Sequence, residues 1–154
     1  MRRAALLIVA LSLGAQRLGW AEGTQEAPDS SGAYSDYAAG RKALDAKNWK
    51  TAIELLNKAA LQDDRNPDIQ NFLGYAHRNA GEIGLAFKHY ERALQLNPRH
   101  RGAHEYVGEA YLLINNLPKA EEHLAVLEKI CVLSCAEYED LKVAIAAYRK
   151  RTGN

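Results

Sequence analysis

Apolar residues recur at helical spacing along most of the chain, and the pattern is clearest between Asn66 and Pro98. Before Gly81 and again after it, apolar side chains fall three or four positions apart, as on one face of an α-helix. Pro67 can open the first helix, where a missing N–H costs nothing, and Pro98 ends the second. The pattern predicts two antiparallel helices with these residues on their buried faces: Ile69, Phe72, Leu73, Ala76, Leu85, Ala86, Tyr90, Ala93 and Leu94.

The same pattern returns along the chain at an interval of 34 residues. Two columns of small residues follow this interval: Gly40, Gly74 and Gly108, and Ala52, Ala86 and Ala120. A sustained period of this length is typical of a solenoid, in which each unit buries its apolar face against the next one. Small residues where two helices cross let the backbones approach closely. We therefore expect three two-helix repeats, over about 33–66, 67–100 and 101–134.

A further helix is predicted after the third repeat, from Cys135 to about Arg151. The segment from Ser134 to Glu137 has the spacing of a capping box, which opens a helix. Three apolar residues then recur on one face: Leu141, Ile145 and Tyr148.

These repeats resemble the tetratricopeptide repeat (TPR) family over about residues 33–134. His77 and Gln70 depart from the family pattern, which usually has an aromatic residue and commonly a tryptophan at these two positions. The resemblance implies an all-α fold over 33–154, a right-handed helical solenoid of three helix-turn-helix repeats closed by a C-terminal capping helix at about 135–151. The matching residues are Leu73, Gly74, Gly81, Ala86, Tyr90, Ala93, Leu94 and Pro98 in the middle repeat, Val107, Gly108, Tyr111, Ala120 and Leu124 in the third, and Gly40, Trp49, Ala52, Leu56 and Ala59 in the first.

The resemblance also implies a concave groove, lined by outward-facing positions of the first helix in each repeat. Carried over, these positions are Tyr34, Tyr37, Arg41, Leu44, Asp68, Asn71, Tyr75, Arg78, Asn79, Glu105, Glu109, Leu112 and Leu113. From them we predict a partner-binding site made of Tyr37, Arg41, Asn71, Tyr75, Arg78, Glu105 and Glu109. The groove lacks the lysines and asparagines of the TPR clamp for chaperone C-termini. Its charges suggest a surface that is basic toward one end and acidic toward the other, for a peptide or protein of complementary charge.

The N-terminus has the layout of a secretory signal peptide over residues 1–21. Arg2 and Arg3 precede an apolar run that is too short to span a bilayer, and cleavage is expected after Ala21, with Ala15 as the alternative. Residues 22–32 contain no apolar side chain larger than alanine and are expected to form a disordered tether. The mature protein would then be periplasmic or secreted, with no membrane span.

Charge and composition exclude a nucleic-acid partner. The chain has 20 basic and 19 acidic residues, and loss of Arg2, Arg3 and Arg17 with the signal peptide would leave a net charge of −2. A nucleic-acid-binding protein needs a clustered basic excess instead.

The two cysteines, Cys131 and Cys135, lie four positions apart where one predicted helix ends and the next begins. A tight turn there would allow a disulfide, which an oxidising compartment favours. Free thiols and a metal or redox site are the alternatives. No histidine or methionine lies near the pair in sequence to complete a metal site.

Other candidate chemistry is sparse. His100 and His104 have a metal-ligand spacing, but packing and solvent exposure are the preferred interpretation. The sequence contains no nucleophile elbow, phosphate loop or zinc-protease motif, so we expect neither an enzyme nor a bound cofactor or metal. The leading hypothesis is a non-enzymatic adaptor, scaffold or assembly factor of the bacterial cell envelope. The alternatives are a metal-handling or thiol-active assembly protein that uses Cys131 and Cys135, and a self-associating TPR scaffold.

Overall fold

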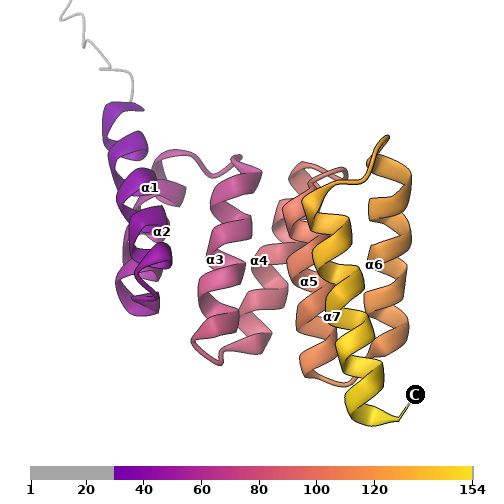
Figure 1. Ribbon diagram of the computed structural model, residues 1–154. Helices are drawn as coiled ribbons and strands as arrows, with labels where there is room; N and C mark the ends of the chain where they lie inside the picture. Colours follow the sequence, from indigo (N-terminus) through magenta and orange to yellow (C-terminus); the bar gives the residue numbers. More distant parts are fainter. Residues whose placement is uncertain (1–29, 154) are drawn as a thin grey trace, which may run out of the picture.

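A computed structural model describes residues 30–153, and these residues form seven α-helices and no strand. The predicted signal peptide and residues 22–29 of the predicted tether lie outside this range. The helices form three antiparallel pairs and a final single helix, stacked side by side into a TPR solenoid (Figure 1). In chain order they are α1 (Ser30–Asp45), α2 (Trp49–Gln62), α3 (Pro67–Asn79), α4 (Ile83–Leu96), α5 (Arg101–Leu113), α6 (Leu117–Ile130) and α7 (Ala136–Thr152).

The start of α1 corrects one predicted boundary. Residues 30–32 were assigned to the tether, but α1 begins at Ser30. This added turn lies over the end of α2, where the backbone of Gly32 approaches the side-chain amide of Gln62. Gln62 also donates a hydrogen bond to Asp36 at 3.5 Å. Contact with α2 therefore extends the helix into a segment whose composition favours disorder.

The turn inside each repeat needs one residue in the left-handed region of the backbone. The three residues are Lys47, Gly81 and Asn115, with φ values of 55°, 83° and 58°, and they are spaced by the 34-residue period. Glycine adopts this conformation freely and asparagine tolerates it, whereas lysine does so at a cost of about 1 kcal/mol. The apolar pattern marks only the glycine as a break between helices. At Lys47 the packing of α1 against α2 overrides the local preference.

The glycine column allows a large side chain of a neighbouring helix to pack directly on the helix backbone. A Cβ atom at Gly40 would lie 2.8 Å from Leu56 of the partner helix α2, and one at Gly74 would lie 2.5 Å from Tyr90 of α4. In the third repeat the contact changes, because a Cβ at Gly108 would lie 2.6 Å from Leu141 of α7. The capping helix thus uses the close-approach site that the repeat pattern would give to α6.

The start of α7 corrects the predicted capping box. The N-cap residue is Cys135, without a side-chain capping hydrogen bond, and the first helical residue is Ala136. Ser134 instead donates a hydrogen bond from its hydroxyl to Glu139 at 2.7 Å. Because the helix starts one residue later than predicted, Glu137 is too close to the cap to close the box.

The capping role of α7 follows from its buried face. Leu141, Ile145 and Tyr148 are 0%, 2% and 5% exposed and pack with Leu112, Ala120 and Leu127 of α5 and α6. The face opposite them is open, since Val143 is 66% exposed. Among the helices of residues 30–153, none combines the length and apolarity that crossing a bilayer requires.

We predict that Gly74→Ala destabilises the protein by about 2–3 kcal/mol, because the new methyl group would overlap the ring of the fully buried Tyr90. Gly84→Ala is the matched control. Gly84 lies in α4 with open space around its Cα, so alanine should leave stability unchanged or raise it by about 0.5 kcal/mol. Urea denaturation followed by circular dichroism measures both, and equal effects of the two substitutions would contradict this account of the glycine column.

Candidate functional site

The predicted groove residues lie along one continuous surface that crosses α1, α3 and α5. We call this surface the groove face and define it by Tyr37, Arg41, Phe72, Tyr75, Arg78, Tyr106 and Glu109. It is continuous because side chains of each first helix contact those of the next: Tyr37 meets Phe72, Tyr75 meets Tyr106, and Arg78 meets Glu109.

The groove face contains two similar contacts between an arginine and aromatic rings, which we call steps. The first step joins α1 to α3 through Arg41. The guanidinium carbon of Arg41 lies 5.2 Å from the centre of the Phe72 ring and 6.0 Å from that of Tyr37. The two rings are themselves 6.0 Å apart. Arg41 remains exposed, so its charge can still contact a ligand. A guanidinium on an aromatic ring is partly immobilised, which lowers the entropic cost of binding.

A pocket of about 220 Å³ opens beside this step. Its walls combine aromatic rings with two cationic side chains, and it is lined by Arg41, Leu44, Asp45, Lys47, Trp49, Phe72, Tyr75 and Tyr106. Trp49 and Tyr75 meet edge to face, with ring centres 6.0 Å apart. Rigid aromatic walls near arginine are the surroundings in which binding energy is usually concentrated.

The second step lies one repeat further along and again consists of an arginine packed against two aromatic rings. The guanidinium carbon of Arg78 lies 5.3 Å from the Tyr75 ring centre and 5.4 Å from the Tyr106 ring centre. Arg78 also forms an ion pair with Glu109 and reaches the backbone carbonyl of Tyr106 at 3.5 Å. Its side chain is only 11% exposed. Arg78 therefore holds α3 to α5, and its charge is largely neutralised by Glu109.

Two predicted contact residues are buried at the floor of the groove instead of projecting from it. Asn71 is 3% exposed, and its side-chain oxygen has no hydrogen-bond partner among the described residues. Glu105, at the equivalent position of the next repeat, is 9% exposed. Burial first, and then the neighbouring carboxylates, raise the pKa of Glu105 to about 8.

Leu44 and Leu112 also differ from the expectation. Both are 7% exposed and belong to the core, so each contributes only to the wall of a pocket and does not project from the groove. Stacking of successive repeats covers these positions, because each first helix packs against the first helix of the following repeat.

Phe72 and Tyr106 were not predicted to line the groove. They are 34 residues apart, so they form an aromatic column that the repeat alignment contains. Each packs against an arginine of the preceding repeat. In each case that arginine follows an aromatic residue of its own helix by three or four positions, as Arg41 follows Tyr37. This combination is the signal that could have revealed both steps.

The other end of the groove contains a second pocket of about 320 Å³ between α3, α5 and α7. It is lined by Arg78, Asn79, Glu109, Leu112, Leu113, Ala144, Ala147, Tyr148 and Arg151. Leu113 is 59% exposed there, and Arg151 stacks over the ring of Tyr148 with 5.4 Å between the guanidinium and the ring centre. This end thus carries charges of both signs rather than acidic groups alone.

His100 and His104, which have a metal-ligand spacing in the sequence, make separate contacts in the structure. His100 bonds to Asp68 at 2.9 Å and caps α5 by accepting from the backbone N–H of Ala103. His104 lies against His123 instead, with 2.9 Å between their Nδ1 atoms. Within residues 30–153 the structure contains no cluster of three or more histidine, cysteine or acidic side chains suited to a metal ion.

The contact between His104 and His123 fixes their tautomers. His104 Nε2 lies 3.0 Å from the carbonyl oxygen of Pro98, to which it must donate. Its Nδ1 therefore carries a lone pair in the neutral ring and accepts from the Nδ1–H of His123. One repeat earlier, Nδ1 of His89 lies 2.9 Å from Oε1 of Gln70 and donates to it. The contact with His123 requires a neutral ring at His104, because its Nδ1 has to accept.

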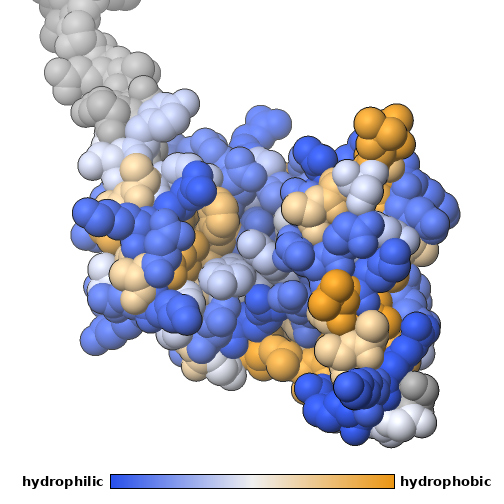
Figure 2. Space-filling view, in the orientation of Figure 1, coloured by the Kyte–Doolittle hydropathy of each residue, from blue (hydrophilic) through white to orange (hydrophobic). Residues whose placement is uncertain are grey.

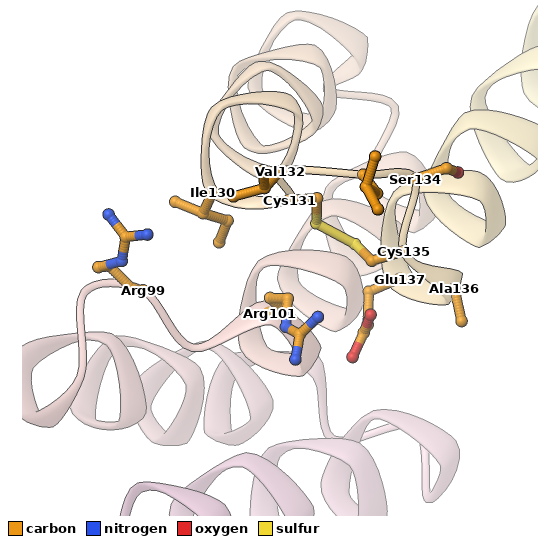
Figure 3. Close-up of a pocket in the computed structure, with 10 residues that line it drawn as sticks. Arg99, Arg101, Ile130, Cys131, Val132, Ser134, Cys135, Ala136 and Glu137 are labelled. Atoms are coloured by element: carbon orange, nitrogen blue, oxygen red, sulfur yellow. A yellow bond between two sulfur atoms is a disulfide. The ribbon is translucent and has the colours of Figure 1, made fainter.

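Cys131 and Cys135 form a disulfide in the structure, with their Sγ atoms 2.05 Å apart and their Cα atoms 5.8 Å apart. The loop that it closes presents Val132 and Leu133, which are 94% and 85% exposed. Hydrophobic atoms accordingly protrude over the α6–α7 connection in Figure 2. A pocket of about 640 Å³ lies beside the disulfide, and Arg99, Arg101 and Glu137 border it (Figure 3).

The tetratricopeptide repeat model matches residues 37–98 and 76–131, which together span more than half of the chain. The chain belongs to the tetratricopeptide repeat family. No curated protein matches the sequence of this TPR protein. The fold resembles solved structures at low sequence identity.

Three of these structures contain a bound peptide or protein region. The first TPR domain of Spaghetti (RPAP3), bound to an HSP90 peptide, has a TM-score of 0.71 and 17% identity, and the match covers 84% of this chain and 99% of that one. PcrH in complex with the chaperone binding region of PopD has a TM-score of 0.70 and 16% identity, covering 80% and 95%. SycD of Yersinia enterocolitica in complex with a peptide of the translocator YopD has a TM-score of 0.65 and 14% identity, covering 78% and 91%.

We predict that His89 and His123 titrate near pH 4. Burial, and then the neighbouring His77 and His104 respectively, lowers the pKa of each from 6.5 to about 4. Between these pH values the unfolded chain binds more protons than the folded protein, so stability falls as the pH decreases from 6.5 to 4. Histidine Cε1–H NMR titration measures the two midpoints, with assignments from His89→Gln and His123→Gln. Midpoints near 6.5 would contradict the buried, neutral pairs.

Proposed function

We propose that this TPR protein is a non-enzymatic interaction module that binds a segment of a peptide or protein in its groove. The observation that carries the proposal is the pair of aromatic–arginine steps along the groove face. They lie on the first helices of three consecutive repeats and leave an open pocket of about 220 Å³ beside the exposed Arg41. A series of anchoring points separated by one repeat suits a chain that runs along the groove more than a small molecule in one cavity.

The solved neighbours support the same class of ligand. The Spaghetti domain holds an HSP90 peptide, PcrH holds the chaperone binding region of PopD, and SycD holds a peptide of YopD. At 14–17% identity these neighbours show the fold alone, so the partner of this protein has to be found from its own groove face.

The proposed setting is the bacterial cell envelope, as an adaptor, scaffold or assembly factor. The support is the charged start and apolar run of residues 1–21, which have the layout of a secretory signal peptide. An oxidising compartment would also allow the bond between Cys131 and Cys135 to persist. In this proposal the disulfide fixes the connection between the last repeat and α7, and it is not a catalytic group.

Intact-mass spectrometry of protein isolated from the envelope fraction tests both parts of this setting. We expect a chain that begins at Glu22 and takes up no alkylating reagent until a reductant is added. A chain that retains residues 1–21 would contradict export. Alkylation without reductant would contradict the disulfide and support the alternative of a thiol-active protein.

Groove binding is tested with peptides selected from a displayed random library on the immobilised protein. We expect Arg41→Glu to weaken their binding at least tenfold, because the reversed charge lies beside the pocket that they would enter. Arg92→Glu is the matched control, since Arg92 is an exposed residue of α4 and lies outside the groove face. Fluorescence anisotropy gives the affinities. Peptides that bind both variants equally would show that the binding surface is elsewhere.

A further inference from the structure

Glu105 is a buried acid without a partner. Its side chain sits on α5 at the floor of the groove, where the residue is 9% exposed, and it makes no hydrogen bond or ion pair with any residue between 30 and 153. Arg78, by contrast, is paired with Glu109, whereas Asn71 Oδ1 at the equivalent position of the preceding repeat also lacks a partner. A buried carboxyl group in this condition costs the fold stability, which is unusual unless another molecule completes its contacts.

The surroundings of Glu105 are acidic. The carboxylates of Glu109 on α5, and of Glu137 and Asp140 on α7, all disfavour its ionised form, in addition to its burial. The cation among its electrostatic neighbours is Arg78 of α3, and Arg78 is committed to Glu109 and to two aromatic rings. Arg101, an exposed residue, borders the pocket beside the disulfide together with Glu137 (Figure 3). The floor of the groove between α5 and α7 therefore has more negative than positive charge.

The position of Glu105 allows a ligand to reach it. It occupies, in the third repeat, the position of Asn71 in the second, one turn before Glu109 on the same helix. The groove face ends at Glu109, and the second pocket continues from there toward α7. A ligand that enters the groove beside Glu109 would therefore lie within one helical turn of Glu105.

We propose that Glu105 receives a lysine or arginine side chain of the bound segment, with Glu137 and Asp140 contributing to the attraction. This inference rests on the proposed function, because the cation is expected to arrive as part of a groove ligand. The ammonium or guanidinium group would donate hydrogen bonds to Glu105 and offset the surplus of carboxylates around it. The requirement for a cation at this place would make the groove selective among peptides of similar hydrophobicity.

The proposal predicts that ligand binding releases a proton from Glu105. The pKa of Glu105 is about 8 in the free protein, so at pH 7 its carboxyl group is protonated in about nine molecules of ten. Pairing with a cation favours the ionised form, and the proton then leaves for the solvent. Binding should release nearly one proton at pH 7. The affinity should rise by up to about tenfold per pH unit from pH 6 to 8 and level off above pH 8.

The test uses the peptides that bind the groove, defined as those weakened by Arg41→Glu and not by Arg92→Glu. We expect these peptides to share a lysine or arginine, and its replacement by norleucine should weaken binding to the wild type but not to Glu105→Gln. Calorimetry in phosphate and in Tris at pH 7 should show proton release with the wild type and none with Glu105→Gln. Glu128→Gln, at an exposed position of α6, is the matched control and should behave as the wild type.

Groove-dependent peptides that contain no basic residue and release no proton would overturn the inference while leaving the proposed function intact. A second measurement does not depend on finding peptides. The 13C signal of the Glu105 carboxyl group is titrated with N-acetylarginine amide at tens of millimolar, against the same concentration of tetramethylammonium. A lower midpoint with the arginine probe alone supports the inference, and equal midpoints overturn it.

Discussion

The close approach of helices at the glycine column is the constraint on which the rest of the structure depends. Where Gly40 and Gly74 face Leu56 and Tyr90, the absence of a Cβ atom lets each first helix lie directly on its partner. This contact fixes the distance and the crossing of each pair, and so the displacement from one repeat to the next. At Gly108 the same gap is filled by Leu141, which attaches α7 to the array and closes its apolar end.

The groove face is a consequence of that regular displacement. Because successive first helices are offset by one repeat, an aromatic residue of one helix lies beside an arginine of the preceding helix, as Phe72 lies beside Arg41. The second step adds the ion pair between Arg78 and Glu109, which joins α3 to α5. These contacts prearrange the groove before any ligand arrives, and they leave Arg41 exposed and Glu105 without a partner.

Sequence patterns predicted the repeats, the helix pairs and the capping helix, because glycine spacing and helical periodicity are local and recur three times. They also predicted that Tyr37, Arg41, Tyr75 and Arg78 share one surface, since these residues occupy the repeat positions that face the groove in the TPR family. Whether such a residue projects or is covered depends on the next repeat. Asn71 and Glu105 were therefore placed correctly on the helix and incorrectly in exposure.

The chain by itself determined its period, its all-helical fold and the order of its repeats, because small and large apolar residues at fixed intervals admit few other ways to bury them. Only the tertiary structure decided which polar groups meet. His104 could have faced His100 by spacing, yet it bonds to His123 of the neighbouring helix, and Lys47 adopts a left-handed backbone that its own sequence disfavours. Each of these outcomes depends on a side chain or helix distant in sequence, whose position is fixed only when the paired helices close on one another.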